Sequence, residues 1–296
     1  MNEYVLSCES PVDLTEARLF ERDIHYIPFH AFLDGKEVRD DLGTTFDYRE
    51  FYKAISEGVM TRTSQINSDE YRTYFEEFLK EGKDVIHLSL SGGLTGTINS
   101  ARIARTLLEE EYPDRKIYLV DSLCASAGYG LLTILAADRR DEGMSIDEVY
   151  AWCEQNKLRV NHWLFSTDLT YYIRGGRISK TAGFVGKLLN ICPLINIDYM
   201  GHLVPKEKIR SKKRAMDAVL NRMIELADDG LDYADRCFIS HSDDYEDAKA
   251  LADMIEQRFP KIKGKVEISY IGTTIGAHAG PNTVSLFFLG KERPVE

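Results

Sequence analysis

The chain has 296 residues, which suits two domains or one large one, and its hydrophobic content of 44% is typical of a globular protein. Its 48 acidic and 37 basic residues give a net charge of −11, which excludes a uniformly basic nucleic-acid-binding surface. The five cysteines form no C-x-x-C pair, the first residues carry no signal peptide, and no apolar run reaches about 18 residues, so we expect a cytoplasmic protein without a metal site.

The first half of the chain alternates between strand-like and helical patterns. Residues 30–38 predict a β-hairpin that turns at Asp34-Gly35, a dipeptide typical of type I′ turns. Ser68 is expected to cap the helix that follows it. The predicted strands span 3–8, 84–90 and 116–120, and the predicted helices span 13–23, 47–57, 68–81, 99–111, 124–140 and 146–158.

The second half repeats this alternation. Strands are predicted at 163–166, 237–241, 266–271 and 283–289, helices at 180–189, 210–229 and 245–258, and a hairpin over 191–197 and 202–205. Alternation of this kind predicts an α/β fold with largely parallel sheets flanked by helices. We place the boundary between two α/β domains at residue 165, so that they span 1–165 and 166–296, with a mixed sheet in the second.

Two segments place hydroxyl side chains and glycines where predicted elements begin or end. They lie just before the third predicted helix and just after the second predicted strand, and contain Thr63, Ser64, Ser91, Thr95 and Gly96. Open α/β sheets bind ligands at the carboxyl ends of their strands, where backbone N–H groups favour an anion. Helix capping and a glycine-rich turn explain the same residues equally well from spacing alone.

Two further segments carry a basic side chain beside glycine. Arg177 follows Gly175-Gly176, which would break a helix and let the guanidinium approach a ligand or an interface. His278 stands before Gly280-Pro281, where a turn residue is the more common role of a lone histidine. No G-x-S-x-G, G-x-x-x-x-G-K-[ST] or H-x-x-x-H motif occurs, and we interpret Gly128-Tyr129-Gly130 as the packing of a helix against a sheet.

Taken together and in order, the segments resemble the DegV family of bacterial fatty-acid-binding proteins over roughly residues 60 to 290. That family carries T-S-Q-P-S, L-S-S-x-L-S-G-T-Y-x-S-A, G-G-R-I, E-K-x-R-x-K-K-R-A and H-x-G-P-G segments. The corresponding segments here read TRTSQINS, LSLSGGLTGTINSA, YYIRGGRISKTAGFVGKLLNICPLI, EKIRSKKRAM and HAGPNTVSLFFLG. Five such segments in order indicate the family far more strongly than one.

The chain departs from the family pattern at four places. Ser7-Cys8-Glu9-Ser10 stands where the family usually ends its first strand in T-D-S, and Asn282 replaces the second glycine of the last motif. Ile66 takes the place of a proline, whereas Thr95 replaces a serine and keeps the hydroxyl. The first two departures fall on the outer pocket wall, on which the preference for one acyl chain over another depends.

The resemblance implies a tunnel between two α/β domains that holds one long-chain fatty acid as its ligand, with no cofactor. The residues that would hold the carboxylate are Thr63, Ser64, Ser91, Thr95, Gly96 and His278. Apolar residues of 184–197 would form tunnel wall. Because each buried methylene contributes about 0.8 kcal/mol, a long acyl chain can drive binding while the head group meets neutral donors.

The resemblance also implies a carrier rather than an enzyme, since a separate kinase subunit would phosphorylate the bound fatty acid to an acyl phosphate. Arg177 and Arg210 match family arginines and would contact the kinase or the phosphate. A basic cluster around Arg210 would suit an acidic partner or an anionic membrane surface rather than nucleic acid; it comprises Lys206, Lys208, Arg210, Lys212, Lys213 and Arg214. A small-molecule transferase that acts alone is the alternative.

Overall fold

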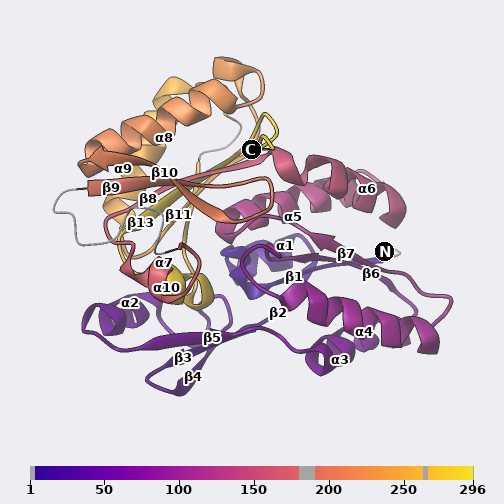
Figure 1. Ribbon diagram of the computed structural model, residues 1–296. Helices are drawn as coiled ribbons and strands as arrows, with labels where there is room; N and C mark the ends of the chain where they lie inside the picture. Colours follow the sequence, from indigo (N-terminus) through magenta and orange to yellow (C-terminus); the bar gives the residue numbers. More distant parts are fainter. Residues whose placement is uncertain (1–3, 180–190, 263–265, 296) are drawn as a thin grey trace.

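The computed structural model describes residues 4–179, 191–262 and 266–295, which form three sheets with helices between and around them (Figure 1). The first sheet is parallel, with strand order β2-β1-β6-β7. Its strands are β1 (Tyr4–Glu9), β2 (Ile24–Ile27), β6 (Asp84–Ser89) and β7 (Ile117–Asp121). Every residue of β1 is buried, as in strands whose two faces are both covered. The predicted parallel sheet of the first half is therefore confirmed.

Helices cover both faces of the parallel sheet. One apolar cluster joins the sheet to α3 (Ser68–Lys80) and α4 (Thr97–Glu111). On the other face the sheet packs against α5 (Ser126–Asp141) and α6 (Ile146–Asn156), and the short α1 (Glu16–Glu21) precedes β2.

The N-terminus of α3 corrects the prediction that Ser68 is its cap. The Asn67 side chain accepts hydrogen bonds from the backbone N–H groups of Asp69 and Glu70, and the Glu70 carboxylate accepts one from the Asn67 N–H. This reciprocal arrangement is a capping box. Asparagine and serine both cap helices well, so the sequence alone does not show which of these two neighbouring residues is the cap.

A small antiparallel sheet contains β3 (Phe29–Leu33), β4 (Lys36–Asp40) and β5 (Thr61–Ser64), with β3 in the middle. The hairpin between β3 and β4 turns as predicted, because Asp34 and Gly35 both take positive φ, of 47° and 77°. No strand is predicted for the segment that forms β5. Its pairing with β3 makes it a strand, which sends its side chains alternately to opposite faces. Between β4 and β5 lies α2 (Tyr48–Ser56).

The third sheet is mixed, as predicted, with strand order β10-β9-β8-β13-β11-β12. Neighbouring strands are antiparallel except for β11 and β12. Its strands are β8 (Val160–Ser166), β9 (Ile191–Ile197), β10 (Leu203–Arg210), β11 (Cys237–His241), β12 (Glu267–Tyr270) and β13 (Thr283–Leu289). α8 (Lys212–Leu226) and α9 (Tyr245–Arg258) lie over one face, and the short α7 (Thr170–Arg174) and α10 (Thr273–Ala279) lie between this sheet and the small sheet (Figure 1).

Two predictions for the second half need comment. The strand predicted at 202–205 continues to Arg210, and the helix predicted from 210 begins only at Lys212. β10 is an edge strand whose charged residues face solvent, so its pattern lacks the apolar alternation that marks a buried strand. The helix predicted at 180–189 lies outside the described residues.

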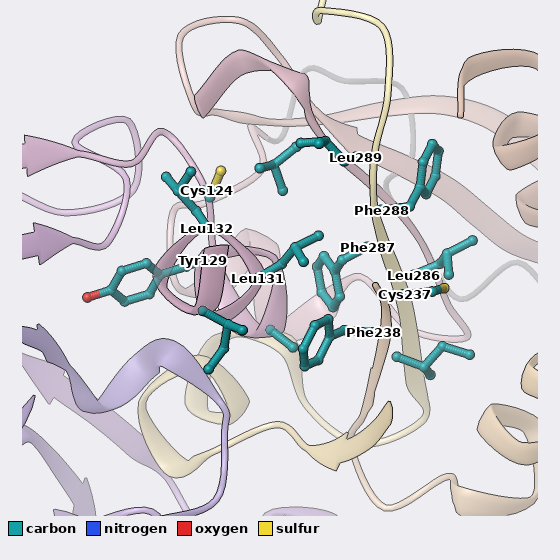
Figure 2. Packing of buried hydrophobic residues seen from close by; sticks show 14 of the residues in the cluster. Cys124, Tyr129, Leu131, Leu132, Cys237, Phe238, Leu286, Phe287, Phe288 and Leu289 are labelled. Carbon is teal, nitrogen blue, oxygen red and sulfur yellow. The ribbon is translucent and has the colours of Figure 1, made fainter. Parts of the chain in front are cut away.

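α5 is the central helix of the fold, with 13 of its 16 residues buried. Figure 2 shows Tyr129 pointing from this helix to one side and Leu131 pointing toward Phe287 on the other. A Cβ on Gly128 would overlap His162 and lie 2.6 Å from Phe287 Cδ1, which confirms that this glycine allows close helix-to-sheet packing. One core cluster therefore includes residues of both large sheets.

The domain boundary at residue 165 falls within β8, all of whose partners belong to the mixed sheet, and it stays a prediction. Within the described ranges, no helix combines the length and the apolar character that crossing a bilayer requires.

Candidate functional site

A cavity of about 560 Å³ lies where the parallel sheet, the small sheet and the mixed sheet meet. This volume is within the range of ligand pockets, about 300–1,000 Å³. Most of the wall is apolar, and its larger side chains are Phe29, Leu90, Leu94, Leu164, Ile197, Leu203, Ile271, Ile275 and Phe287. Of the predicted wall segment 184–197, residues 184–190 lie outside the described residues, and Ile197 lines the cavity.

The exposed residues of the lining gather at one end and mark its opening. They are Met60, Arg62, Gln65, Gly96 and Arg174. Other lining residues, such as Ser285 on β13, are buried, and we call this enclosed part of the lining the inner end. The cavity thus has a polar, cationic opening and an enclosed interior.

Thr63 and His278 meet near this opening although 215 residues separate them. Thr63 Oγ1 lies 2.8 Å from His278 Nε2. β5 directs Thr63 inward, and α10 brings His278 across the small sheet. The structure therefore joins two of the predicted site residues at a single point of the lining.

Arg177 holds His278 from its other side. Arg177 Nη1 lies 3.3 Å from His278 Nδ1 and also donates to the Gly175 carbonyl at 2.7 Å. Its Nε and Nη2 both donate to the Leu94 carbonyl, at 3.2 and 3.1 Å. The guanidinium is thus committed mainly to contacts within the lining, rather than standing free on the surface.

These contacts fix the direction of hydrogen bonding. Arginine has only donors, so His278 Nδ1 must be the acceptor, and a neutral ring then carries its proton on Nε2. That Nε2–H donates to Thr63 Oγ1, which leaves the Thr63 hydroxyl proton available to a ligand in the cavity. The pKa of His278 is lowered to about 3. Burial is the main cause, and the positive charges of Arg177 and Arg174 act in the same direction. The ring is therefore neutral near pH 7, as this arrangement requires.

Gly175 explains why the chain has glycines before Arg177. A Cβ at this position would overlap His278 Nδ1, so only glycine lets the end of α7 approach the imidazole. Gly176 takes a φ of 74°, a conformation that other residues adopt only under strain. The Gly-Gly pair is therefore required both by the contact and by the backbone.

Thr95 and Gly96 line the cavity from the loop between β6 and α4. Thr95 Oγ1 accepts a hydrogen bond of 3.4 Å from the Thr97 N–H, so it also acts at the start of α4. A Cβ on Gly96 would lie 2.9 Å from Gln65 Oε1. Gln65 is a lining residue that the sequence analysis did not select, although it directly follows the Thr63-Ser64 pair.

Three predicted residues are not brought to the cavity. Ser64 is exposed on the face of β5 opposite to Thr63. Ser91 Oγ donates to the Gly201 carbonyl at 2.9 Å and accepts from the Gly93 N–H at 3.1 Å, so it fastens the loop to the β9–β10 turn. Arg210 is exposed at the end of β10, seven residues and therefore about 23 Å from Leu203, which lines the cavity.

Two arginines at the opening were missed. Arg62 lies over the Phe32 ring at 4.7 Å, and Arg174 lies over the Tyr171 ring at 5.0 Å. Arg174 lines the cavity and is exposed, so it places positive charge where an anion would enter, whereas Arg62 shares the outer face of β5 with Ser64. Among the residues that the structure describes, no group of three or more His, Cys, Asp or Glu side chains is arranged to hold a metal ion.

The departures from the family pattern have structural explanations. Glu9 is buried and accepts hydrogen bonds from Tyr71 Oη (2.5 Å), Ser89 Oγ (2.8 Å) and the Leu90 N–H (2.7 Å), so it anchors the strand end that leads into the cavity loop. Asn282 takes a φ of 64°, and asparagine tolerates this left-handed conformation better than most residues do.

Comparison with known proteins covers nearly the whole chain. A family model described as "Uncharacterised protein, DegV family" matches residues 6–291. A DegV domain-containing protein of Clostridium perfringens is 37% identical over 290 residues, which cover 98% of each chain.

Two solved structures have the same fold. One is a fatty-acid-binding DegV family protein from Thermus thermophilus, with a TM-score of 0.85 and 25% identity over 97% of this chain and 99% of the other. The second is the Fatty Acid Kinase B3 protein of Streptococcus pneumoniae loaded with linoleic acid, with a TM-score of 0.83 and 20% identity over 97% and 99% of the two chains. From these matches and the family model, we conclude that the chain belongs to the DegV family.

Proposed function

We propose that this protein binds a long-chain fatty acid, with its carboxylate at Thr63 and Thr95 near the opening and its acyl chain along the apolar wall. The observation that carries this proposal is the Arg177–His278–Thr63 series of hydrogen bonds at one end of a mostly apolar cavity. The series presents a hydroxyl donor to the cavity, backed by a guanidinium. A carboxylate needs such donors, and a hydrocarbon chain needs the rest of the wall.

Energetics favour a long chain. At about 0.8 kcal/mol for each buried methylene, a chain of sixteen carbons contributes on the order of 10 kcal/mol before ordering costs. Removing the carboxylate from water opposes binding, and hydrogen bonds to a charged acceptor offset that cost. Arg174 adds positive charge near the place where the carboxylate would lie. The DegV family protein of Thermus thermophilus binds a fatty acid, and we extend that ligand class to this chain.

We further propose that the protein presents its fatty acid to a separate kinase, which forms the acyl phosphate. The name of the Streptococcus pneumoniae protein, with which this chain shares its fold, supports a partner of this kind. Arg174 at the opening would meet the phosphate or the partner, whereas Arg177 orients His278. Arg210 would contact the partner only if the docking surface extends to the far end of β10.

A transferase that acts alone is less well supported. Thr63 and His278 have the spacing of a nucleophile and its base. A useful general base has a pKa near the working pH, whereas the pKa of His278 is about 3 because the ring is buried beside two arginines. The pair is therefore suited to holding a proton in place, not to removing one.

Mass spectrometry of organic extracts from the purified protein tests the proposal. We expect about one fatty acid for each chain. Leu203→Trp would fill the cavity and should lose the lipid, while Leu107→Trp, an exposed leucine on α4, should keep it. A wild-type protein that neither carries a fatty acid nor binds added stearic acid would exclude this function.

A further inference from the structure

The inner end of the cavity carries a second set of hydroxyl groups, apart from those at the opening. β13 turns Thr283, Ser285 and Phe287 toward the cavity, because alternate residues of a strand share a face. Ser285 is only 3% exposed. Thr274, also 3% exposed, lines the cavity from α10. The wall opposite to the opening is therefore not uniformly apolar.

One of these hydroxyls is not satisfied by the protein. Within the described part of the chain, no hydrogen-bond partner reaches Ser285 Oγ. Thr274 instead faces Asp40: its N–H donates to Asp40 Oδ2 at 3.4 Å, and its hydroxyl lowers the pKa of that carboxyl, which burial raises. By contrast, the Thr283 hydroxyl lies 3.2 Å from Tyr172 Oη. A buried hydroxyl without a partner is destabilising, so such groups in a cavity point to a polar ligand atom.

These hydroxyls belong to one polar cluster rather than to isolated positions. Ser285 lies directly opposite Ser240 on β11, which places their Cβ atoms about 5 Å apart. Ser240 Oγ lies 2.8 Å from Ser126 Oγ, and Ser126 also lines the cavity and donates to Asp13 at 2.5 Å. Asp13 accepts a further bond of 2.8 Å from the Gly272 N–H at the start of α10. The cluster is thus held in position by the mixed sheet, α5 and the start of α10.

We propose that this inner cluster recognises an oxygen atom on the acyl chain, so that the preferred ligand is a hydroxy or oxo fatty acid. The inference rests on the proposed fatty acid binding and specifies its substrate class. A plain hydrocarbon chain would leave Ser285 without a partner. A hydroxyl group on the chain both donates and accepts, and an oxo group accepts from the Ser285 hydroxyl.

The test compares stearic acid with hydroxystearic acids that carry the hydroxyl at successive positions from the middle of the chain to its terminal carbon. Each is titrated calorimetrically into delipidated protein. We expect at least one isomer to bind about five- to tenfold more tightly than stearic acid, the gain from one hydrogen bond between neutral groups. Ser285→Ala should abolish that preference.

Ser269→Ala is the matched control, since Ser269 on β12 also has a buried, unpartnered hydroxyl among the described residues but does not line the cavity. This variant should keep the wild-type preference. If stearic acid binds more tightly than every hydroxy isomer, or if Ser285→Ala keeps the preference, the inner cluster serves only to hold water and the inference is overturned. If stearic acid itself does not bind, the proposed function fails, and the inference fails with it.

Discussion

Replacing Thr63 with valine tests the proposed head-group site most directly. Valine keeps the branched shape of threonine but removes the hydroxyl that receives the His278 proton and offers its own proton to the cavity. His278 Nε2 loses its partner in both the free and the ligand-bound protein. This loss therefore lowers the stability of the fold but has little effect on the difference in free energy between the two states, which sets the affinity. What remains is one hydrogen bond to a charged acceptor, worth about 1.5–3 kcal/mol. The dissociation constant for palmitic acid should therefore rise about 10- to 100-fold.

The assay is calorimetric titration of delipidated protein with palmitic acid at pH 7.5, with thermal unfolding recorded for each variant. Ser64→Ala is the matched control, because Ser64 is the next residue on the same strand and faces solvent on the other side. Its dissociation constant should stay within about twofold of the wild-type value. An unchanged affinity in Thr63→Val, or an equal loss in Ser64→Ala, would falsify the proposed placement of the carboxylate.

Three further predictions address other parts of the structure. Because the pKa of His278 falls to about 3 on folding, the unfolded chain binds a proton below about pH 6.5 that the folded chain does not bind. As the pH falls, this group should therefore lower the free energy of unfolding by up to about 1.4 kcal/mol per pH unit. Urea titrations of His278→Gln at about pH 6.5 and pH 5 should show a smaller decline than those of the wild type. Arg210→Ala should retain the bound fatty acid by mass spectrometry, because Arg210 lies at the far end of β10; loss of the lipid would contradict this and place the arginine at the cavity. If the variant slows phosphorylation by the kinase, the slowing should become smaller as salt is added. Gly128→Ala should lower the unfolding free energy by about 1–3 kcal/mol in chemical denaturation, because its Cβ overlaps His162 and crowds Phe287; a stability equal to wild type would contradict the tight packing of α5.

The sequence predicts the fold well where its elements are long and periodic. The helix at 245–258 and the strands at 237–241 and 283–289 coincide with α9, β11 and β13. Short elements are less predictable, because a hydrophobic pattern of four to seven residues is too short to identify a helix or a strand. Tertiary contacts then decide which of the two forms. β5 and α10 are of this kind, and both contribute to the head-group end of the cavity.

The candidate site shows the same limit at the level of single side chains. Thr63 and Ser64 are neighbouring hydroxyl residues in one motif, and only the pairing of β5 with β3 decides that the first faces the cavity. Ser285 is hidden in a strand that looks uniformly apolar in the sequence. The contact of Arg177 with His278 spans 101 residues, so the sequence identifies both residues but gives no reason to join them.

The position of α5 has a thermodynamic consequence. Ala125 and Ser126, at its N-terminal end, line the cavity, while the rest of the helix lies in the core cluster that both large sheets share. A ligand that binds only the folded state raises stability by about 2.7 kcal/mol at a hundredfold excess over its dissociation constant. Because the helix that lines the cavity is also common to both sheets, the gain from a ligand bound there should be distributed over the entire molecule. Calorimetry should then record a single cooperative transition that moves to higher temperature as fatty acid is added, with neither half melting ahead of the other.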